Sequence, residues 1–411
     1  MKPDHGVALE EALKVILQSL AHLEPEVEEV ALATVLGRIA AVDMVAKEDL
    51  PPFDRAAIDG FAIHSSDVKD ASLEQPVSLR ISGAVRMGEA AGFVLQPGEA
   101  ALIPTGGMLP PGADAVLMLP TSSSVVEDRL LVPYPVTAQE NVILRGEDFK
   151  QDVLVAKRGE VLSPQLIGAL AACGYSSVKV NKRTRAAILS TGDEVVDVGG
   201  TVGEGQIRDV NSYALGAVLE QVGCQVERCG IVPDESETLY GAMEKALVSS
   251  DLILISGGSS AGAREKTLEV LQRFDTQGVL LKEIAVNPGK LTIFAMIGRT
   301  PVFALPGQPV AAMTVCNALV KPAAALLLGQ KPPEAVHRIL ARLTRSVASV
   351  MGRDDFIRVR LVRRGGDYWA EPIDGKPGLI STLLKADGIV HISEVKSGLY
   401  GQEWVEIELL N

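Results

Sequence analysis

Hydrophobic and polar positions change their spacing several times along the 411 residues. Residues 8–23 carry apolar side chains at helical spacing, which predicts an amphipathic helix. The run Val27–Ala46 continues with helical periodicity and predicts a second helix. Another helix is predicted near Gln165–Cys173, where Ser163 and Pro164 form a start signal.

Between these segments the pattern is one of short apolar stretches separated by Gly and Pro, such as Val77–Ser82, Ala100–Pro104, Ala115–Leu119 and Leu130–Val136. This pattern is typical of strands and turns. Residues 53–150 are therefore predicted to be a β-rich insert domain. Residues 1–52 and 151–180, which flank it, are predicted to form one elongated mixed domain.

Strands and helices alternate after Arg185. Continuously apolar strands of this kind are typical of a sheet covered on both faces, so residues 181–330 are predicted to be a doubly wound parallel-sheet domain. Asn211 and Asp234 are predicted to cap two of its helices. Residues 331–411 return to β-type patterning and are predicted to form a C-terminal β-barrel-like domain. The predicted fold class is multidomain α/β plus β.

Composition and charge restrict the classes of function that we expect. The net charge of −13 disfavours a nucleic-acid partner, because phosphate neutralisation needs a basic surface. Four separated cysteines give neither a zinc motif nor a disulfide framework, and with no signal-peptide pattern they favour the cytoplasm. The apolar stretch Val310–Leu328 is interrupted by Asn317, Lys321 and Pro322, so it is predicted to be a buried helix without a membrane role.

Three predicted strands end in loops rich in Gly and Ser, namely Ser190–Glu194, Ser256–Ser260 and Leu305–Pro309. Ligands of doubly wound sheets bind at such strand ends, where glycine N–H groups and helix N-termini can contact phosphate. One such loop is more often an ordinary tight turn. Three in one sheet favour an anionic small-molecule site.

Acidic residues follow the same strand ends. Asp193, Glu194, Asp234 and Glu265 offer the hard oxygen ligands that Mg²⁺ prefers beside phosphate, although capping explains Asp234 or Glu265 equally well. Lys290 follows a Pro-Gly turn and could attract an oxyanion, but a solvated lysine is the usual alternative.

The insert carries polar turns that physical reasoning alone does not explain. The motifs Pro52–Ala62, Pro104-Thr105-Gly106, Gly112–Val116, Arg145–Asp148, Ser190–Glu194, Gly205-Gln206-Ile207, Ser256-Gly257-Gly258, Pro288-Gly289-Lys290 and Leu305-Pro306-Gly307 stand in this order. In that order they resemble the molybdopterin molybdenumtransferases, including the E domain of gephyrin, over nearly the whole chain.

The resemblance implies an elongated homodimer of four-domain chains, with each active site between the α/β domain of one subunit and the insert of the other. It implies a reaction of adenylylated molybdopterin with molybdate that requires Mg²⁺ and releases AMP. It also implies a molybdopterin adenylyltransferase as a candidate protein partner.

The resemblance further assigns roles to individual residues. The implied catalytic residues are Asp59, Thr105, Glu194, Asp234 and Lys290. The implied ligand-binding residues are Thr191, Gly192, Asp193, Ser256, Gly257, Gly258, Ser259, Pro306, Gly307 and Arg353. The implied metal ligands are Glu194, Asp234 and Glu265.

The chain departs from the family pattern at six positions in five motifs: Glu265 replaces Asp, Asn287 replaces Lys, Gln308 replaces Asn, Ala311 replaces Ser, and Lys376-Pro377-Gly378 replaces Gly-Ser-Gly. They remove a cation and hydroxyl donors near the expected oxyanion pocket. The alternatives are a non-catalytic pterin-nucleotide carrier, a tungstate-specific insertase and a nucleotide pyrophosphatase.

Overall fold

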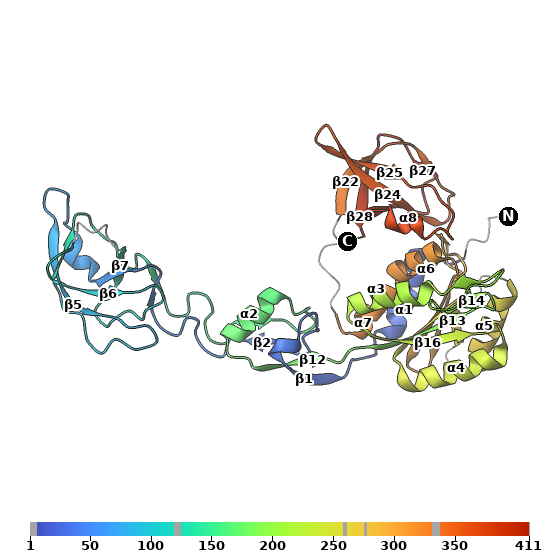
Figure 1. Cartoon of the computed structure of the whole chain (residues 1–411), viewed down its shortest axis with the longest axis horizontal. Coiled ribbons are helices and arrows are strands. Elements are labelled where there is room, and N and C mark those ends of the chain that lie inside the picture. The colour runs from blue at the N-terminus through green and yellow to red at the C-terminus, as the bar shows by residue number, and fades with distance from the viewer. Residues whose placement is uncertain (1–5, 119–124, 258–260, 275–277, 331–337, 411) are drawn as a thin grey trace.

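The computed structural model describes residues 6–118, 125–257, 261–274, 278–330 and 338–410. The molecule is elongated (Figure 1). The insert lies at one end, a narrow middle segment follows, and the α/β domain lies at the other end with the C-terminal domain above it.

The middle segment contains strands where the sequence predicted a helix. Its elements are β1 (Val27–Ala31), the short 3₁₀ turn Leu32–Thr34, β2 (Met44–Val45), β11 (Leu154–Ala156), α2 (Pro164–Ala172) and β12 (Ser177–Asn181). β1 pairs antiparallel with β12, and β2 pairs with β11.

The predicted helix over Val27–Ala46 is therefore wrong. β1 alternates exposed and half-buried positions, as a strand with one covered face does, and Gly37 has a positive φ of 72° that a helix would not allow. The predicted start of α2 is confirmed, because Ser163 Oγ accepts the N–H of Leu166 at 3.3 Å.

The insert is β-rich, as predicted. Its sheet has the strand order β7-β4-β6-β5-β9-β8, and β3 (Arg55–Ala56) pairs separately with β10 (Val142–Ile143). The strands of the sheet are β4 (Gly60–Ile63), β5 (Val77–Ala84), β6 (Glu99–Ile103), β7 (Ala115–Met118), β8 (Val125–Val126) and β9 (Arg129–Val132).

The α/β domain has a six-stranded sheet of order β16-β13-β17-β21-β20-β18. Its strands are β13 (Arg185–Thr191), β16 (Gln225–Val232), β17 (Leu252–Ser256), β18 (Gly278–Leu281), β20 (Ile293–Ile297) and β21 (Thr300–Leu305). The small pair β14 (Val195–Val196) and β15 (Ile207–Arg208) lies beside it.

The prediction of a fully parallel sheet needs correction. β16, β13, β17 and β21 are mutually parallel, but β20 runs antiparallel to both β21 and β18. Gly298 and Arg299 alone separate β20 from β21, and a two-residue turn can connect only antiparallel strands. The sheet is mixed.

Helices cover both faces of this sheet, each over its own apolar core. One core contains residues of α1 (Leu9–Leu20), α3 (Asn211–Val222), α6 (Pro309–Val315) and α7 (Lys321–Leu327). The other contains residues of α4 (Ser236–Ser249) and α5 (Ala261–Arg273). The continuous helix Pro309–Leu327 is long and apolar enough to cross a membrane, but 61% of it is buried in the first core, as predicted.

The C-terminal domain is a closed barrel, in which β24-β25-β22-β28-β26 returns to β24. Its elements are β22 (Arg338–Leu343), β23 (Val347–Ala348), β24 (Asp354–Arg364), β25 (Asp367–Pro372), α8 (Ser381–Leu384), β26 (Gly388–Ile392), β27 (Gly398–Leu399) and β28 (Trp404–Leu409). β19 (Val286–Asn287) pairs with the start of β24 and joins this barrel to the α/β domain.

Candidate active site

The three strand-end loops meet at the beginning of α3. Asn211 Nδ2 donates to Ser256 Oγ and to the carbonyl oxygen of Gly307, both at 2.9 Å. Asp209 Oδ2 accepts the hydroxyl of Ser190 at 2.7 Å. One short segment thus connects the loops that follow β13, β17 and β21.

Asn211 is not the helix cap that the sequence predicted. It is the first residue of α3, and its side chain points to the neighbouring loops instead of the helix. Asp209 takes the capping role, because its Oδ1 accepts the N–H of Ser212 at 3.1 Å and its Oδ2 accepts the Ser212 hydroxyl at 2.6 Å. Asp234 is likewise outside its helix, since α4 begins at Ser236.

A pocket of about 360 Å³ opens between these loops. Its walls come from the ends of β13, β17 and β21 and from the start of α3, and the C-terminal domain adds Gly378 and Ile380. The predicted ligand-binding residues that line it are Thr191, Ser256, Gly257 and Gly307, together with Glu194. Gly258 and Ser259 lie outside the described residues.

Gly257 allows the closest approach of two loops in this pocket. Its φ is 138°, and a Cβ there would lie 2.0 Å from the carbonyl oxygen of Thr191. Only glycine tolerates both conditions, and its own backbone N–H donates to the Leu305 carbonyl oxygen at 3.4 Å, which ties the loop after β17 to the end of β21. Gly192 has a similar φ of 141°, and a Cβ there would lie 2.7 Å from Glu194 Oε2.

Three predicted acidic residues form a cluster beside the pocket. Asp193 Oδ1 accepts the backbone N–H of Asp234 at 3.1 Å, and Lys266 donates to the Asp234 carbonyl oxygen. Burial raises the pKa of Asp234 above its usual value, and the charges of Asp193 and Glu194 raise it further, against the opposing effect of Lys266. The negative potential there is only partly compensated.

This cluster suits a divalent cation that also contacts a phosphate. Within the described ranges no three Asp, Glu, His or Cys side chains form a ready metal cage. Mg²⁺ commonly takes one or two carboxylates and completes its shell with phosphate oxygens and water, which Asp234 with Glu194 would allow. Glu265 is exposed on α5, and its role as a third ligand stays a prediction.

Lys290 and Arg353 are both ion-paired. Lys290 Nζ lies 3.2 Å from Glu283 Oε2, and Arg353 Nε lies 3.1 Å from Asp355 Oδ1. The parallel pairing of β19 with β24 brings the two segments close together. Each cation therefore already has an anionic neighbour at the boundary between the α/β domain and the barrel.

The family departures lie at the same boundary. The carbonyl oxygen of Pro377 accepts the N–H of Val310 at 3.0 Å, so the barrel loop occupies one of the donors in the first turn of α6. Asn287 is half-buried in β19, Ala311 is buried in α6, and Lys376 is exposed. Pro306, another predicted ligand-binding residue, is buried just before α6.

Asp59 and Thr105 form a separate polar pair on the insert. Asp59 Oδ1 accepts the N–H of Thr105 at 2.7 Å and its hydroxyl at 2.9 Å, and these two bonds lower the pKa of Asp59. The pair is solvent-exposed, and the insert that carries it lies at the end of the molecule opposite the α/β domain (Figure 1). Within one chain the two residues do not join the strand-end pocket.

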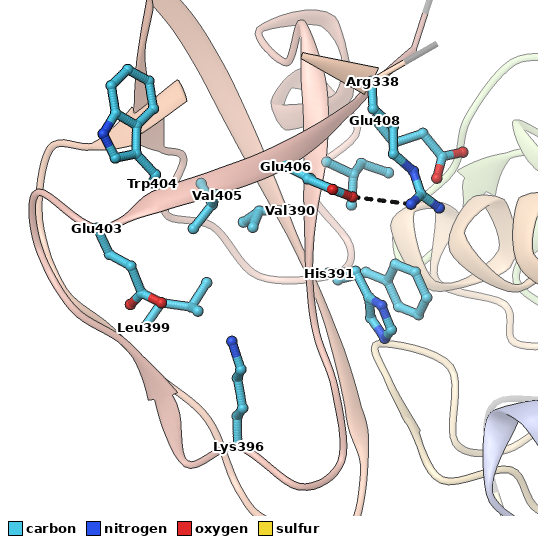
Figure 2. A pocket seen from close by; sticks show the side chains of 12 residues that line it. Arg338, Val390, His391, Lys396, Leu399, Glu403, Trp404, Val405, Glu406 and Glu408 are labelled. Carbon is cyan, nitrogen blue, oxygen red and sulfur yellow. Dashed lines mark hydrogen bonds and ion pairs between the residues drawn. The ribbon is translucent and has the colours of Figure 1, made fainter. Parts of the chain in front are cut away.

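Two other hollows contain none of the predicted site residues that the structure describes. One, of about 260 Å³, lies on the barrel, where Arg338 pairs with Glu406 at 3.0 Å (Figure 2). The other, of about 910 Å³, lies beside β1 and the start of β13 and is lined by ion pairs such as Lys182–Glu26. Neither lies at the carboxyl ends of the parallel strands, because the larger hollow is at their opposite ends, where β13, β16 and β21 begin.

Sequence reasoning missed the importance of Asp209 and Asn211. Both are buried, and they supply the contacts that hold the loops together. A usable signal was present, because Asp209, Asn211 and Ser212 cluster at the start of a helix that is otherwise apolar on one face.

Comparison with known proteins identifies the family. Three family models match in succession: the MoeA N-terminal region (domain I and II) at residues 7–174, a probable molybdopterin binding domain at 187–325, and the MoeA C-terminal region (domain IV) at 340–410. Molybdopterin molybdenumtransferase 1 of Mycobacterium tuberculosis is 32% identical over 95% of this chain and 96% of its own length. A molybdopterin molybdenumtransferase of Haemophilus influenzae is 30% identical over 98% of this chain and 99% of its own.

Comparison with solved structures points to the same family. A molybdopterin biosynthesis MoeA protein from Pyrococcus horikoshii superposes with a TM-score of 0.82 at 36% identity, covering 99% of both chains. A second structure of such a protein from the same organism gives a TM-score of 0.84 at 29% identity, covering 98% of this chain and 99% of its own. The strand-end pocket and these full-length matches together show that the chain belongs to the molybdopterin molybdenumtransferases, a family of transferases in molybdenum-cofactor biosynthesis.

Proposed function

We propose that this chain inserts molybdenum from molybdate into adenylylated molybdopterin and releases AMP in a Mg²⁺-dependent reaction. The observation that carries the proposal is the strand-end pocket, where glycine-bearing loops lie beside an acidic cluster with a raised Asp234 pKa. A phosphoanhydride with a bound cation matches both parts of such a site.

Different residues would have different roles in this reaction. The backbone of Gly307 and Gln308, which line the pocket just before α6, would bind phosphate oxygens, as backbone donors in strand-end loops do. Asp234 and Glu194, with Asp193 behind them, would hold Mg²⁺ to neutralise charge on the pyrophosphate link. Lys290 and Arg353 would attract the oxyanion, with Glu283 and Asp355 fixing their positions.

A homodimer would complete each site. Because Asp59 and Thr105 are exposed and far from the pocket of their own chain, we propose that they face the pocket of a second copy. Mixing the inactive variants Asp59→Asn and Glu194→Gln tests this arrangement. A shared site predicts recovery of roughly a quarter of wild-type activity, because half of the dimers regain one intact site of two. No recovery on mixing would overturn the shared site.

AMP release tests the reaction itself. The purified chain is incubated with adenylylated molybdopterin, and molybdate or Mg²⁺ is omitted in turn. The proposal expects AMP only when both are present. Tight binding without release would indicate a carrier, release with tungstate alone a tungstate insertase, and cleavage of ordinary dinucleotides without an oxyanion a pyrophosphatase.

We also propose a cytoplasmic location and transfer of substrate from a molybdopterin adenylyltransferase. The acidic net charge of −13 and the reduced form expected of four unpaired cysteines support the location. Co-purification of the adenylyltransferase with this chain, and its loss in competition with free substrate, would test the transfer.

A further inference from the structure

The amide of Asn211 has a fixed orientation. The carbonyl oxygen of Gly307 can only accept, so the side-chain atom 2.9 Å from it must be Nδ2. The second N–H of the same group is used by Ser256 Oγ. Both donors of Asn211 are therefore committed to holding the loop after β17 and the loop after β21 at one separation.

This orientation leaves Oδ1 of Asn211 unsatisfied. The residue is only 8% exposed, and within the described part of the chain Oδ1 has no hydrogen-bond partner. Thr191 Oγ1, on another wall of the same pocket, is also buried without a partner. Buried polar atoms in folded proteins are almost always paired, so two unpaired ones on residues that line the same pocket point to a ligand.

We propose that Asn211 has two roles in this pocket: Nδ2 positions the two loops, and Oδ1 accepts a hydrogen bond from the bound substrate. The inference rests on the proposed function, since it takes adenylylated molybdopterin as the substrate. An amide oxygen selects an N–H or O–H group and disfavours an ionised phosphate, which carries no proton to donate. The phosphates therefore lie away from Asn211 Oδ1, toward Gln308 in the loop before α6, and a pterin N–H or a ribose hydroxyl lies against Asn211.

The test compares the same isosteric change at two buried asparagines. Asn211→Asp replaces the donor by an acceptor that faces the Gly307 carbonyl, and Asn211→Ala removes both groups without adding charge. Asn181→Asp is the matched control, because Asn181 is equally buried and its Nδ2 donates to the Leu328 carbonyl at 2.8 Å, away from the pocket.

We expect both Asn211 variants to raise KM for adenylylated molybdopterin about tenfold or more, with a smaller change in kcat, because the lost contacts are made in the bound ground state. Asn181→Asp should lower the melting temperature without raising KM. Binding of AMP alone and of molybdopterin alone identifies the donor: the fragment whose Kd rises in Asn211→Ala supplies it. Unchanged KM in folded Asn211 variants, or an equal rise in Asn181→Asp, would overturn the proposal.

Hydrogen exchange of the ligand-free protein separates this inference from the proposed function. Faster exchange at Gly257 and Gly307 in Asn211→Ala, and not in Asn181→Asp, supports the positioning role even if the wild type releases no AMP. Equal exchange in the two variants contradicts it. A wild type that binds no adenylylated molybdopterin would overturn the proposed function and the recognition role together, while the exchange data still decide positioning.

Discussion

The strand-end pocket and the Asp59–Thr105 pair are built in opposite ways. In the pocket the polar side chains are buried, and Asn211 contacts residues 45 and 96 positions away along the chain, while Asp209 contacts one 19 positions away. On the insert, Asp59 is exposed and accepts both of its hydrogen bonds from Thr105, at the ends of two central strands, β4 and β6. Folding and function share residues in the first region and are separable in the second.

This contrast follows from the difference in solvent exposure between the two regions. A buried donor or acceptor without a partner is costly, so the pocket can form only when all three loops are in place. Water satisfies the insert pair whether or not another chain covers it. Substitutions of the buried residues of the pocket should therefore reduce both stability and activity, while those of the exposed insert pair should reduce mainly activity.

The largest effect is expected at Gly257. In Gly257→Ala the new Cβ would overlap the Thr191 carbonyl, and φ of 138° is unfavourable for alanine, so we expect a loss of about 3 kcal/mol or more in unfolding free energy. Substrate binding should fall below detection. Chemical denaturation and titration of adenylylated molybdopterin measure the two effects.

Gly262→Ala is the control for this change. A Cβ at Gly262 meets nothing within 4 Å, and the residue lies in the first turn of α5, so alanine should leave stability unchanged or raise it by up to about 1 kcal/mol. If Gly257→Ala unfolds no more easily than Gly262→Ala, the close contact with Thr191 does not constrain the pocket.

Asp209→Asn should have the next largest effect. Asparagine can still accept the N–H of Ser212, but its neutral NH₂ group replaces the carboxylate oxygen that accepts the hydroxyls of Ser190 and Ser212, at a cost of about 1–3 kcal/mol. Asp197→Asn, in an exposed turn where Oδ1 accepts the N–H of Gly199, should cost less than about 0.5 kcal/mol. Similar melting temperatures for the two variants would contradict the structural role of Asp209.

Asp59→Asn tests the other side of the comparison. Thr105 lowers the pKa of Asp59, so the stability this carboxylate contributes is present above its unfolded-state pKa and is lost as pH falls through its folded-state pKa. The variant should therefore melt slightly below the wild type at neutral pH and match it in strong acid, while AMP release is abolished at neutral pH. A large loss of stability would mean that Asp59 is structural.

The same contrast explains what the sequence could predict. The strand Leu252–Ser256 is apolar at nearly every position, and the rule that ligands bind at strand ends then locates the loops without any structure. The helix predicted over Val27–Ala46 was wrong because a half-exposed strand and an amphipathic helix both mix Val with Glu. The short turn at Gly298-Arg299 did indicate an antiparallel pair, and the prediction of a parallel sheet overlooked it.

Long-range polar contacts were beyond prediction. A helix-initial Asn is usually a cap, and the polar residues beside it mark a special helix start without identifying Ser256 and Gly307 as its partners. Asp59 shows the opposite problem. The family resemblance identified it as a catalytic residue, but within one chain it lies far from the pocket. In the proposed shared site its role depends on a second molecule, which cannot be inferred from the residue pattern or from the fold of one chain.

The smallest effect is expected at Asp193, where local repulsion alone changes. Asp193→Asn keeps the oxygen that accepts the Asp234 N–H but removes one of the charges that raise the pKa of Asp234. A raised folded-state pKa means stability that is present below the unfolded pKa and lost as pH rises, so the variant should gain stability at neutral pH and none in acid. The gain should be less than about 1 kcal/mol, because solvent screens these partly exposed groups.

Asp197→Asn decides whether this gain is local. It removes the same charge from the same domain, and the chain as a whole carries −13, so relief of general repulsion would stabilise both variants equally. A gain in stability confined to Asp193→Asn, together with weaker Mg²⁺ dependence of substrate binding, would show that repulsion within the acidic cluster lowers stability and increases affinity for the cation. Equal gains would show that the effect comes from the net charge of the whole chain. The acidic cluster would then have no electrostatic role that is specific to the pocket.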